Sequence, residues 1–213
     1  RRPKRPNSTQ VQIMTTPILY YVADPMCSWC WGFAPTITAL HQQESDAFIF
    51  RYVMGGLARD SEELMPTETR AYVQSAWREV ESRTGARFNW AFWENCQPRR
   101  STYPACRAVL AAAAQNRGPA IFDRIQHAYY LEARNPSDID TLATLAESLD
   151  LDTERFAADL HSAAIEEALQ ADFHLRRKLQ ARSFPSLILE SSGTCSWINR
   201  GWEETATVFA RLE

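Results

Sequence analysis

The chain is poor in glycine and contains no long apolar run. Only seven of its 213 residues are glycine, too few for a turn-rich all-β sandwich. No stretch of about 18 apolar residues occurs, so the sequence predicts no transmembrane helix. Five cysteines, an odd number, fit poorly with a secreted fold held by disulfides. With 45% apolar and 23% charged residues, the composition predicts one globular domain, or one domain with an insertion.

Positive charge is scarce outside the N-terminus. Four of the 23 basic residues lie in the first five positions, so the rest of the chain carries 19 basic against 26 acidic residues. Phosphate contacts need clustered positive charge, which argues against a nucleic-acid-binding protein. The basic N-terminus is followed by no apolar segment of the secretory type. We therefore expect residues 1–14 to be a disordered basic tail and the protein to act in the cytoplasm, where thiols stay reduced.

Apolar runs predict two separated groups of strands. Residues 18–22 and 48–53 are short β-prone runs on either side of a helical pattern at 33–45. This order predicts a right-handed crossover that joins two parallel strands. Near the other end, residues 186–190 and 194–198 predict a hairpin around Ser191-Ser192-Gly193, and a last helix is expected at 203–211.

Between the strand groups the patterns are all helical. Helices are expected at 67–84, at about 101–118, at 120–133, from a cap at Ser137, and twice within 153–181. A hairpin alone is marginally stable, so both strand groups must share one sheet. The sequence thus predicts an α/β fold with a large all-helical insertion.

The segment from Asp24 to Pro35 carries the clearest chemical signal. Cys27 and Cys30 form a C-x-x-C motif between a strand and a helix, which is a redox signal in this context. Two intervening residues bring both sulfur atoms within disulfide reach. Free N–H groups and the positive end of the helix stabilise a thiolate at the first cysteine. We expect Cys27 to be the nucleophile and Cys30 the resolving thiol.

Half of a metal site is the main alternative for this motif. Structural zinc usually needs four ligands, and the sequence has no second C-x-x-C motif. The four histidines are not paired at ligand spacing: His41, His127, His161 and His174. We therefore expect neither a metal nor an organic cofactor.

Three prolines bear on the site. Pro35 lies five residues after Cys30, where it can kink the active-site helix. Pro185 follows Phe184 at the entry of a predicted strand, where a cis peptide is one way to accommodate it, although trans is the usual form. Asp24 precedes Pro25 and is predicted mainly as a turn residue.

These motifs resemble the thioredoxin superfamily, and more closely its DsbA family. The order strand, C-x-x-C helix, strand, Phe-Pro, hairpin and final helix is similar to a thioredoxin-like fold, and a helical insertion is typical of the DsbA type. The segments Asp24–Cys30, Gly55–Leu57, Ala105–Ala108 and Phe184–Leu187 look like the signal-less, FrnE-like members. The resemblance implies a thioredoxin-like domain at residues 15–57 and 181–213, with an inserted helical domain at 58–180.

The resemblance also implies roles for individual residues. Cys27 and Cys30 would be catalytic, Pro185 would be a cis-proline facing them, and the Phe184 backbone would pair with bound substrate. Trp29 would add an apolar surface for a polypeptide or a small organic disulfide. Two positions depart from the pattern. Ser28-Trp29 replaces the Pro-His pair of the periplasmic oxidant, and Tyr21 stands where thioredoxin has a buried acid, so Asp24 is the candidate replacement.

The functional prediction is a thiol-disulfide oxidoreductase or disulfide isomerase. Its partners would be disulfide-containing or thiol proteins, with glutathione as a further candidate. A glutathione-dependent isomerase or transferase of the kappa-class or hydroxychromene-carboxylate isomerase type is an alternative, and a metal-binding C-x-x-C module is another. Cys106 is expected to be buried and reduced, whereas Cys96 and Cys195 could form a second pair that the spacing does not require.

Overall fold

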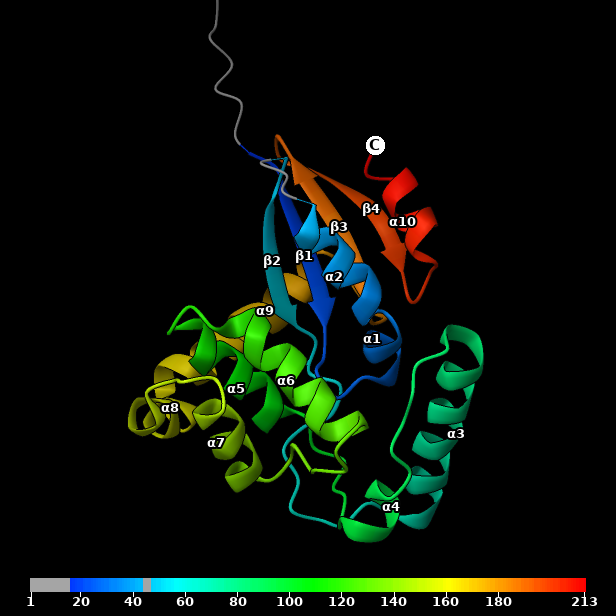
Figure 1. The fold of residues 1–213 in the computed structure, drawn as a ribbon. Coiled ribbons are helices and arrows are strands. Elements are labelled where there is room, and N and C mark those ends of the chain that lie inside the picture. Colours follow the sequence, from blue (N-terminus) through cyan, green and yellow to red (C-terminus); the bar gives the residue numbers. More distant parts are fainter. Residues whose placement is uncertain (1–15, 44–46) are drawn as a thin grey trace, which may run out of the picture.

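The computed structural model describes residues 16–43 and 47–213, and the predicted tail at residues 1–14 lies outside them. A four-stranded sheet has the order β2-β1-β3-β4. The strands are β1 (Ile18–Ala23), β2 (Ile49–Met54), β3 (Ser186–Ser191) and β4 (Thr194–Arg200). Both predicted strand groups therefore join one sheet, as Figure 1 shows.

The central strand β1 connects the two halves of the sheet. It pairs in parallel with β2, placing Tyr21 opposite Tyr52, and antiparallel with β3, placing Tyr21 opposite Leu187. The parallel pair is joined through α1 (Ser28–Gly32) and α2 (Ala34–Gln42). The predicted α/β fold, with a large all-helical segment between β2 and β3, is confirmed.

The predicted helix at residues 33–45 begins earlier and is interrupted. Its helical hydrogen-bond ladder is interrupted at Phe33, which is the C-cap residue of α1 and the N-cap residue of α2. Pro35 lies in the first turn of α2 and has no N–H to donate to the preceding turn, which accounts for the break. The carbonyl of Gly32, at the end of α1, accepts a hydrogen bond from Trp202 Nε1 at 3.1 Å.

Helices occupy the chain between β2 and β3. They are α3 (Thr67–Thr84), α4 (Phe92–Asn95), α5 (Tyr103–Ala113), α6 (Gly118–Tyr130), α7 (Ile139–Glu147), α8 (Thr153–Leu160) and α9 (Ala163–Lys178), and α10 (Thr205–Ala210) follows the sheet. The bounds of α3 agree with the prediction, and Gly85 ends it in a left-handed conformation. The prediction that Ser137 caps this helix is wrong, because Asp138 is the N-cap residue of α7. Ser137 Oγ instead donates to the carbonyl of Ser101.

One hydrophobic core runs through the sheet and the helices. Leu19 and Tyr21 of β1 belong to the same buried cluster as Trp77 of α3 and Ile125 of α6. Around Trp77, the rings of α4 and its neighbours pack at centroid distances of 5.0–5.7 Å: Trp90, Phe92 and Trp93. The helices therefore share their core with the sheet, and the predicted division at residues 57 and 181 stays a prediction about domain organisation.

Candidate active site

The two motif cysteines lie where β1 ends and α1 begins. Cys27 is the N-cap residue of α1, with extended backbone angles, and Cys30 lies one turn into the helix. The backbone N–H of Cys27 donates to the carbonyl of Asp24 at 3.0 Å, which closes the turn that leads out of β1. Cys27 thus lies at the positive, N-terminal end of α1, next to the free N–H groups of the first helical turn.

Hydrogen bonds to its sulfur lower the pKa of Cys27. The largest contribution is the hydrogen bond from the Cys30 thiol, and the backbone N–H groups of Cys30 and Trp29 add to it. Burial and the charge of Asp24 oppose this shift. The net result favours a thiolate at Cys27, although no histidine stands between the two cysteines.

The second thiol is held in its protonated form. Cys30 is completely buried, whereas 7% of Cys27 is exposed. Burial is the largest cause that raises the pKa of Cys30 well above its ordinary value, followed by the hydrogen bond to Cys27 and the charge there. The pair therefore combines one partly accessible thiolate with one inaccessible proton donor.

The loop before β3 faces the nucleophile. The Phe184–Pro185 peptide bond is cis, and the Phe184 carbonyl oxygen lies 3.9 Å from Cys27 Sγ. The carbonyl of Pro185 accepts from the N–H of Gly201 at 2.8 Å, which ties the loop to β4. The Phe184 ring packs over Gly55, where an added Cβ atom would lie 2.6 Å from the ring. Gly55 therefore provides the space in which this ring lies.

Asp24 is a buried acceptor as well as a turn residue. Its Oδ1 accepts from the N–H of Met26 at 2.9 Å, the local turn that the sequence predicts. Its Oδ2 accepts from the N–H of Leu57 and from Thr102 Oγ1, both at 2.7 Å. The predicted turn is therefore present, and the completely buried carboxyl has a second role, because it also connects β1 with the helices. Burial raises its pKa, against the lowering effect of these hydrogen bonds.

Cys106 of α5 belongs to the same polar network. Its thiol donates to Asp24 Oδ2 at 3.6 Å, and the side chain is fully buried. Burial, followed by the charge of Asp24, raises its pKa well above the ordinary value. The predicted buried, reduced cysteine is thus present, but its contact with Asp24 had no sequence signal because 82 positions separate the two residues.

Aromatic side chains form the rim beside the dithiol. Trp29 is partly exposed, and the guanidinium of Arg83 lies 5.1 Å from its ring centroid and 5.6 Å from that of Trp202. Trp31 is partly exposed as well; it stacks on Tyr130 at 5.6 Å, and its Nε1 donates to the carbonyl of Arg87 at 3.0 Å. Both tryptophans therefore keep part of their surface exposed, and Trp29 directly follows Cys27 and Ser28 in the chain.

The other cysteines lie apart from the motif. Cys96 Sγ donates to the carbonyl of Ala133 at 3.1 Å, and Cys195 is exposed on β4. Both are free thiols. Within residues 16–43 and 47–213, no group of three or more histidine, cysteine or acidic side chains is arranged to hold a metal ion.

A dithiol at a helix N-terminus, facing a cis-proline loop on a four-stranded sheet, is the arrangement that the resemblance to the thioredoxin superfamily implies. A family model described as thioredoxin matches residues 20–195. The chain therefore belongs to the thioredoxin family, and its fold is similar to that of solved DsbA-like oxidoreductases.

Solved structures with 25% identity or more share the fold over most of their length. A putative protein disulfide isomerase from Nitrosomonas europaea is 28% identical, with a TM-score of 0.81 over 93% of this chain and 96% of that one. The cytosolic disulfide reductase DsbM from Pseudomonas aeruginosa is 27% identical, with a TM-score of 0.72 over 85% and 89%. DsbM with GSH gives 25% identity and a TM-score of 0.68 over 82% and 88%.

A curated relative has a different description. The ClpXP adapter protein SpxH of Bacillus subtilis (strain 168) is 29% identical over 172 residues, which is 79% of this chain. The match covers 56% of that relative, so this chain spans little more than half of its length. Among the described residues, none forms a helix both long and apolar enough to cross a membrane.

Proposed function

We propose that this protein is a thiol-disulfide oxidoreductase that uses Cys27 as nucleophile and Cys30 as resolving thiol. The observation that carries the proposal is the geometry of the dithiol: Cys27 is the partly exposed N-cap residue of α1, Cys30 is completely buried one turn later, and the Phe184 carbonyl before the cis-proline lies 3.9 Å from Cys27 Sγ. The pKa directions, lowered at Cys27 and raised at Cys30, agree with this arrangement. An attacking thiolate beside a protonated second thiol is the starting state for disulfide reduction.

The reaction follows from this state in two exchanges. The Cys27 thiolate attacks one sulfur of a substrate disulfide, forms a mixed disulfide and releases the other substrate sulfur as a thiolate. Cys30 then loses its proton and attacks the Cys27 sulfur, which releases the second substrate thiol and leaves a Cys27–Cys30 disulfide. Two electrons pass from the dithiol to the substrate disulfide. The reverse sequence inserts a disulfide, and slow resolution by Cys30 permits isomerisation.

Surrounding residues take supporting roles in the proposal. The Phe184 carbonyl, 3.9 Å from Cys27 Sγ, accepts a backbone N–H of bound substrate, and Pro185 holds it in that place. Trp29 offers an apolar contact. Asp24 is a positioning residue, because its two oxygens fix the turn before Cys27 and the Leu57 backbone. Pro35 supports the site by ending the short helix α1.

We infer that the substrates are disulfide-containing or thiol proteins in the cytoplasm. The names of two structural relatives, a putative protein disulfide isomerase and a cytosolic disulfide reductase, support this assignment. The adapter name of the curated relative supports a protein partner.

A redox titration tests the proposal. The purified protein is equilibrated in glutathione buffers of graded potential, alkylated, and read by mass spectrometry at each cysteine. We expect Cys27 and Cys30 to change together as one two-electron couple, and the midpoint gives the direction of reaction in a reducing compartment. If no bond forms between them at any potential, the dithiol mechanism is wrong.

Glutathione-dependent isomerisation or transfer is a second candidate, favoured by the structural similarity to DsbM with GSH. It predicts that Cys30→Ala leaves activity intact and that Cys27 forms only a mixed disulfide with glutathione. The dithiol mechanism predicts instead that Cys30→Ala accumulates mixed disulfides with protein substrates. A metal-binding module predicts stoichiometric zinc binding that blocks alkylation of both thiols, and the described residues supply no third ligand for it.

A further inference from the structure

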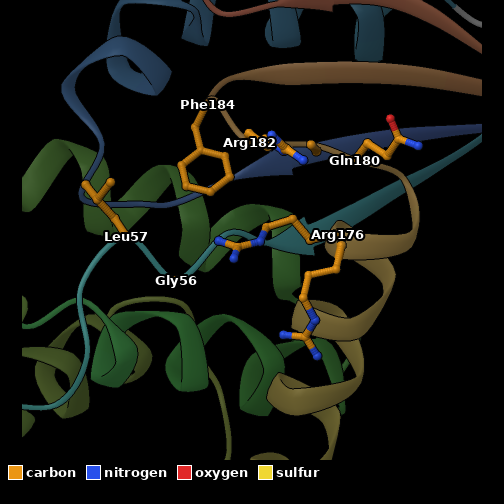
Figure 2. A pocket seen from close by; sticks show the side chains of 8 residues that line it. Gly56, Leu57, Arg176, Gln180, Arg182 and Phe184 are labelled. Atoms are coloured by element: carbon orange, nitrogen blue, oxygen red, sulfur yellow. The ribbon is translucent and has the colours of Figure 1, made fainter.

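A positively charged cavity adjoins the nucleophile on the side of α9. It has a volume of about 560 Å³ and is lined by Gly56, Leu57, Phe184, Arg176, Arg177 and Arg182, among others. Figure 2 shows Gly56 and Leu57 near the Phe184 ring, with Arg182 next to Phe184 and Gln180 farther along the cavity. The Arg176 guanidinium also lies on the Phe184 side of the cavity. Phe184 lines the cavity, and its carbonyl lies 3.9 Å from Cys27 Sγ. This one residue therefore lies between the cavity and the reacting sulfur.

The charges of this cavity are uncompensated. None of the described residues that line it is acidic. The ion pairs of the described chain hold other arginines, such as Arg107 with Asp60 and Arg124 with Glu132, and none includes Arg176, Arg177 or Arg182. The whole chain has a net charge of −3. A local cluster of three cations on an acidic protein therefore attracts anionic ligands to this cavity.

The three arginines divide into one that is anchored and two that are available. Arg176 donates to the carbonyl of Gly55 at 2.5 Å, and its guanidinium lies 5.7 Å from the Phe184 ring centroid. Arg176 therefore contacts both the Gly55 backbone and the Phe184 ring of the loop that faces Cys27. Arg177 and Arg182 are exposed. Guanidinium groups of this kind bind carboxylates through paired N–H donors.

We propose that this cavity binds an acidic segment beside the reactive cysteine of a polypeptide substrate. The inference rests on the proposed function, because it requires a mixed disulfide at Cys27. A chain that pairs with the Phe184 backbone advances about 3.3 Å per residue, so a residue next to the substrate cysteine passes Phe184 and enters the cavity. There Arg177 and Arg182 receive its carboxylate.

Cysteine peptides activated as thiopyridyl disulfides test this inference. Attack by the Cys27 thiolate on the peptide sulfur forms the mixed disulfide and releases thiopyridone, which absorbs light and gives the rate. One peptide has glutamate on both sides of cysteine and a second has glutamine. We expect the acidic peptide to react about tenfold faster at low salt, with the difference shrinking as salt screens the charges.

Variants assign the preference to the cavity. Arg177→Gln combined with Arg182→Gln should slow the acidic peptide by about three- to tenfold and leave the neutral peptide unchanged. Arg78→Gln on α3 is the matched control, because Arg78 is exposed and lies outside the cavity. Replacing both arginines with glutamate should reverse the preference toward a lysine-flanked peptide.

The outcomes separate the inference from the function on which it rests. If the wild-type protein reacts with neither peptide faster than Cys27→Ala does, the proposed function fails. Equal rates for both peptides, unchanged in the double variant, overturn the cavity assignment while the oxidoreductase function stands. An enhancement confined to the thiopyridyl disulfide of glutathione also overturns it, because the source of the carboxylates is then a small thiol.

Discussion

Replacing Cys30 should raise the pKa of Cys27 unless the replacement keeps a hydrogen-bond donor. The Cys30 thiol is the largest contribution that lowers the pKa of Cys27. A hydrogen bond to a charged acceptor stabilises it by about 1.5–3 kcal/mol, and one pKa unit corresponds to about 1.4 kcal/mol. Cys30→Ala should therefore raise the pKa of Cys27 by about 1–2 units. Cys30→Ser, which keeps an O–H donor, should shift it much less.

The ultraviolet absorbance of the thiolate, titrated against pH in both variants, measures this difference. The pH dependence of alkylation at Cys27 gives an independent value. Both variants retain the backbone N–H groups of residues 29 and 30, so the comparison isolates the side-chain donor. If Cys30→Ala titrates at the same pH as Cys30→Ser, or lower, the thiol hydrogen bond does not activate Cys27, and the helix N-terminus must supply the whole effect.

Three further predictions concern the supports of the site. Gly56→Ala should lower the free energy of unfolding, measured in urea, by about 2–5 kcal/mol, because Gly56 has φ +64° and an added Cβ would lie 2.3 Å from the buried Phe173 ring. Gly85→Ala is the control: Gly85 has φ +74° and open space around it, so this variant should lose only the free energy of backbone strain. Equal losses of stability in the two variants would contradict the prediction. Burial raises the pKa of Asp172 from 3.8 to about 6, so the folded state binds more protons than the unfolded one between these values. Wild-type stability should fall by about 2–3 kcal/mol as pH rises through this window, and Asp172→Asn should remove that fall in denaturant titrations. Asp24→Asn should lower the pKa of Cys27 by removing a nearby charge; a rise in the thiolate titration would refute this.

The sequence predicted the elements whose signals are local. Strands and helices follow from runs of apolar residues, and the bounds of α3 agree because helical spacing continues without interruption up to Gly85. The C-x-x-C motif located the dithiol for the same reason, since both cysteines lie in one helical turn. The helix is interrupted between α1 and α2 because Pro35 acts on the hydrogen-bond ladder of the preceding turn, the effect that the sequence predicts for this proline.

The residues that complete the site lie far apart in the sequence, and no sequence pattern links them. Thr102 and Cys106 reach Asp24 across 78 and 82 positions. An aspartate before a proline is typical of a turn, and only the packing of α5 against the end of β1 reveals its second role. Arg177 and Arg182 resemble ordinary surface charges in the sequence, because their significance comes from the loop that brings Phe184 beside them.

The chain crosses between sheet and helices at two places, and both adjoin the nucleophile. It leaves β2 through Gly55–Leu57 and returns to β3 through the segment that ends at Phe184 and Pro185. Any hinge motion of the helices relative to the sheet must turn about these two segments. They also carry the ring, the carbonyl and the backbone N–H groups that surround Cys27 and Asp24. A displacement of either segment would therefore directly alter the groups that contact Cys27 and Asp24.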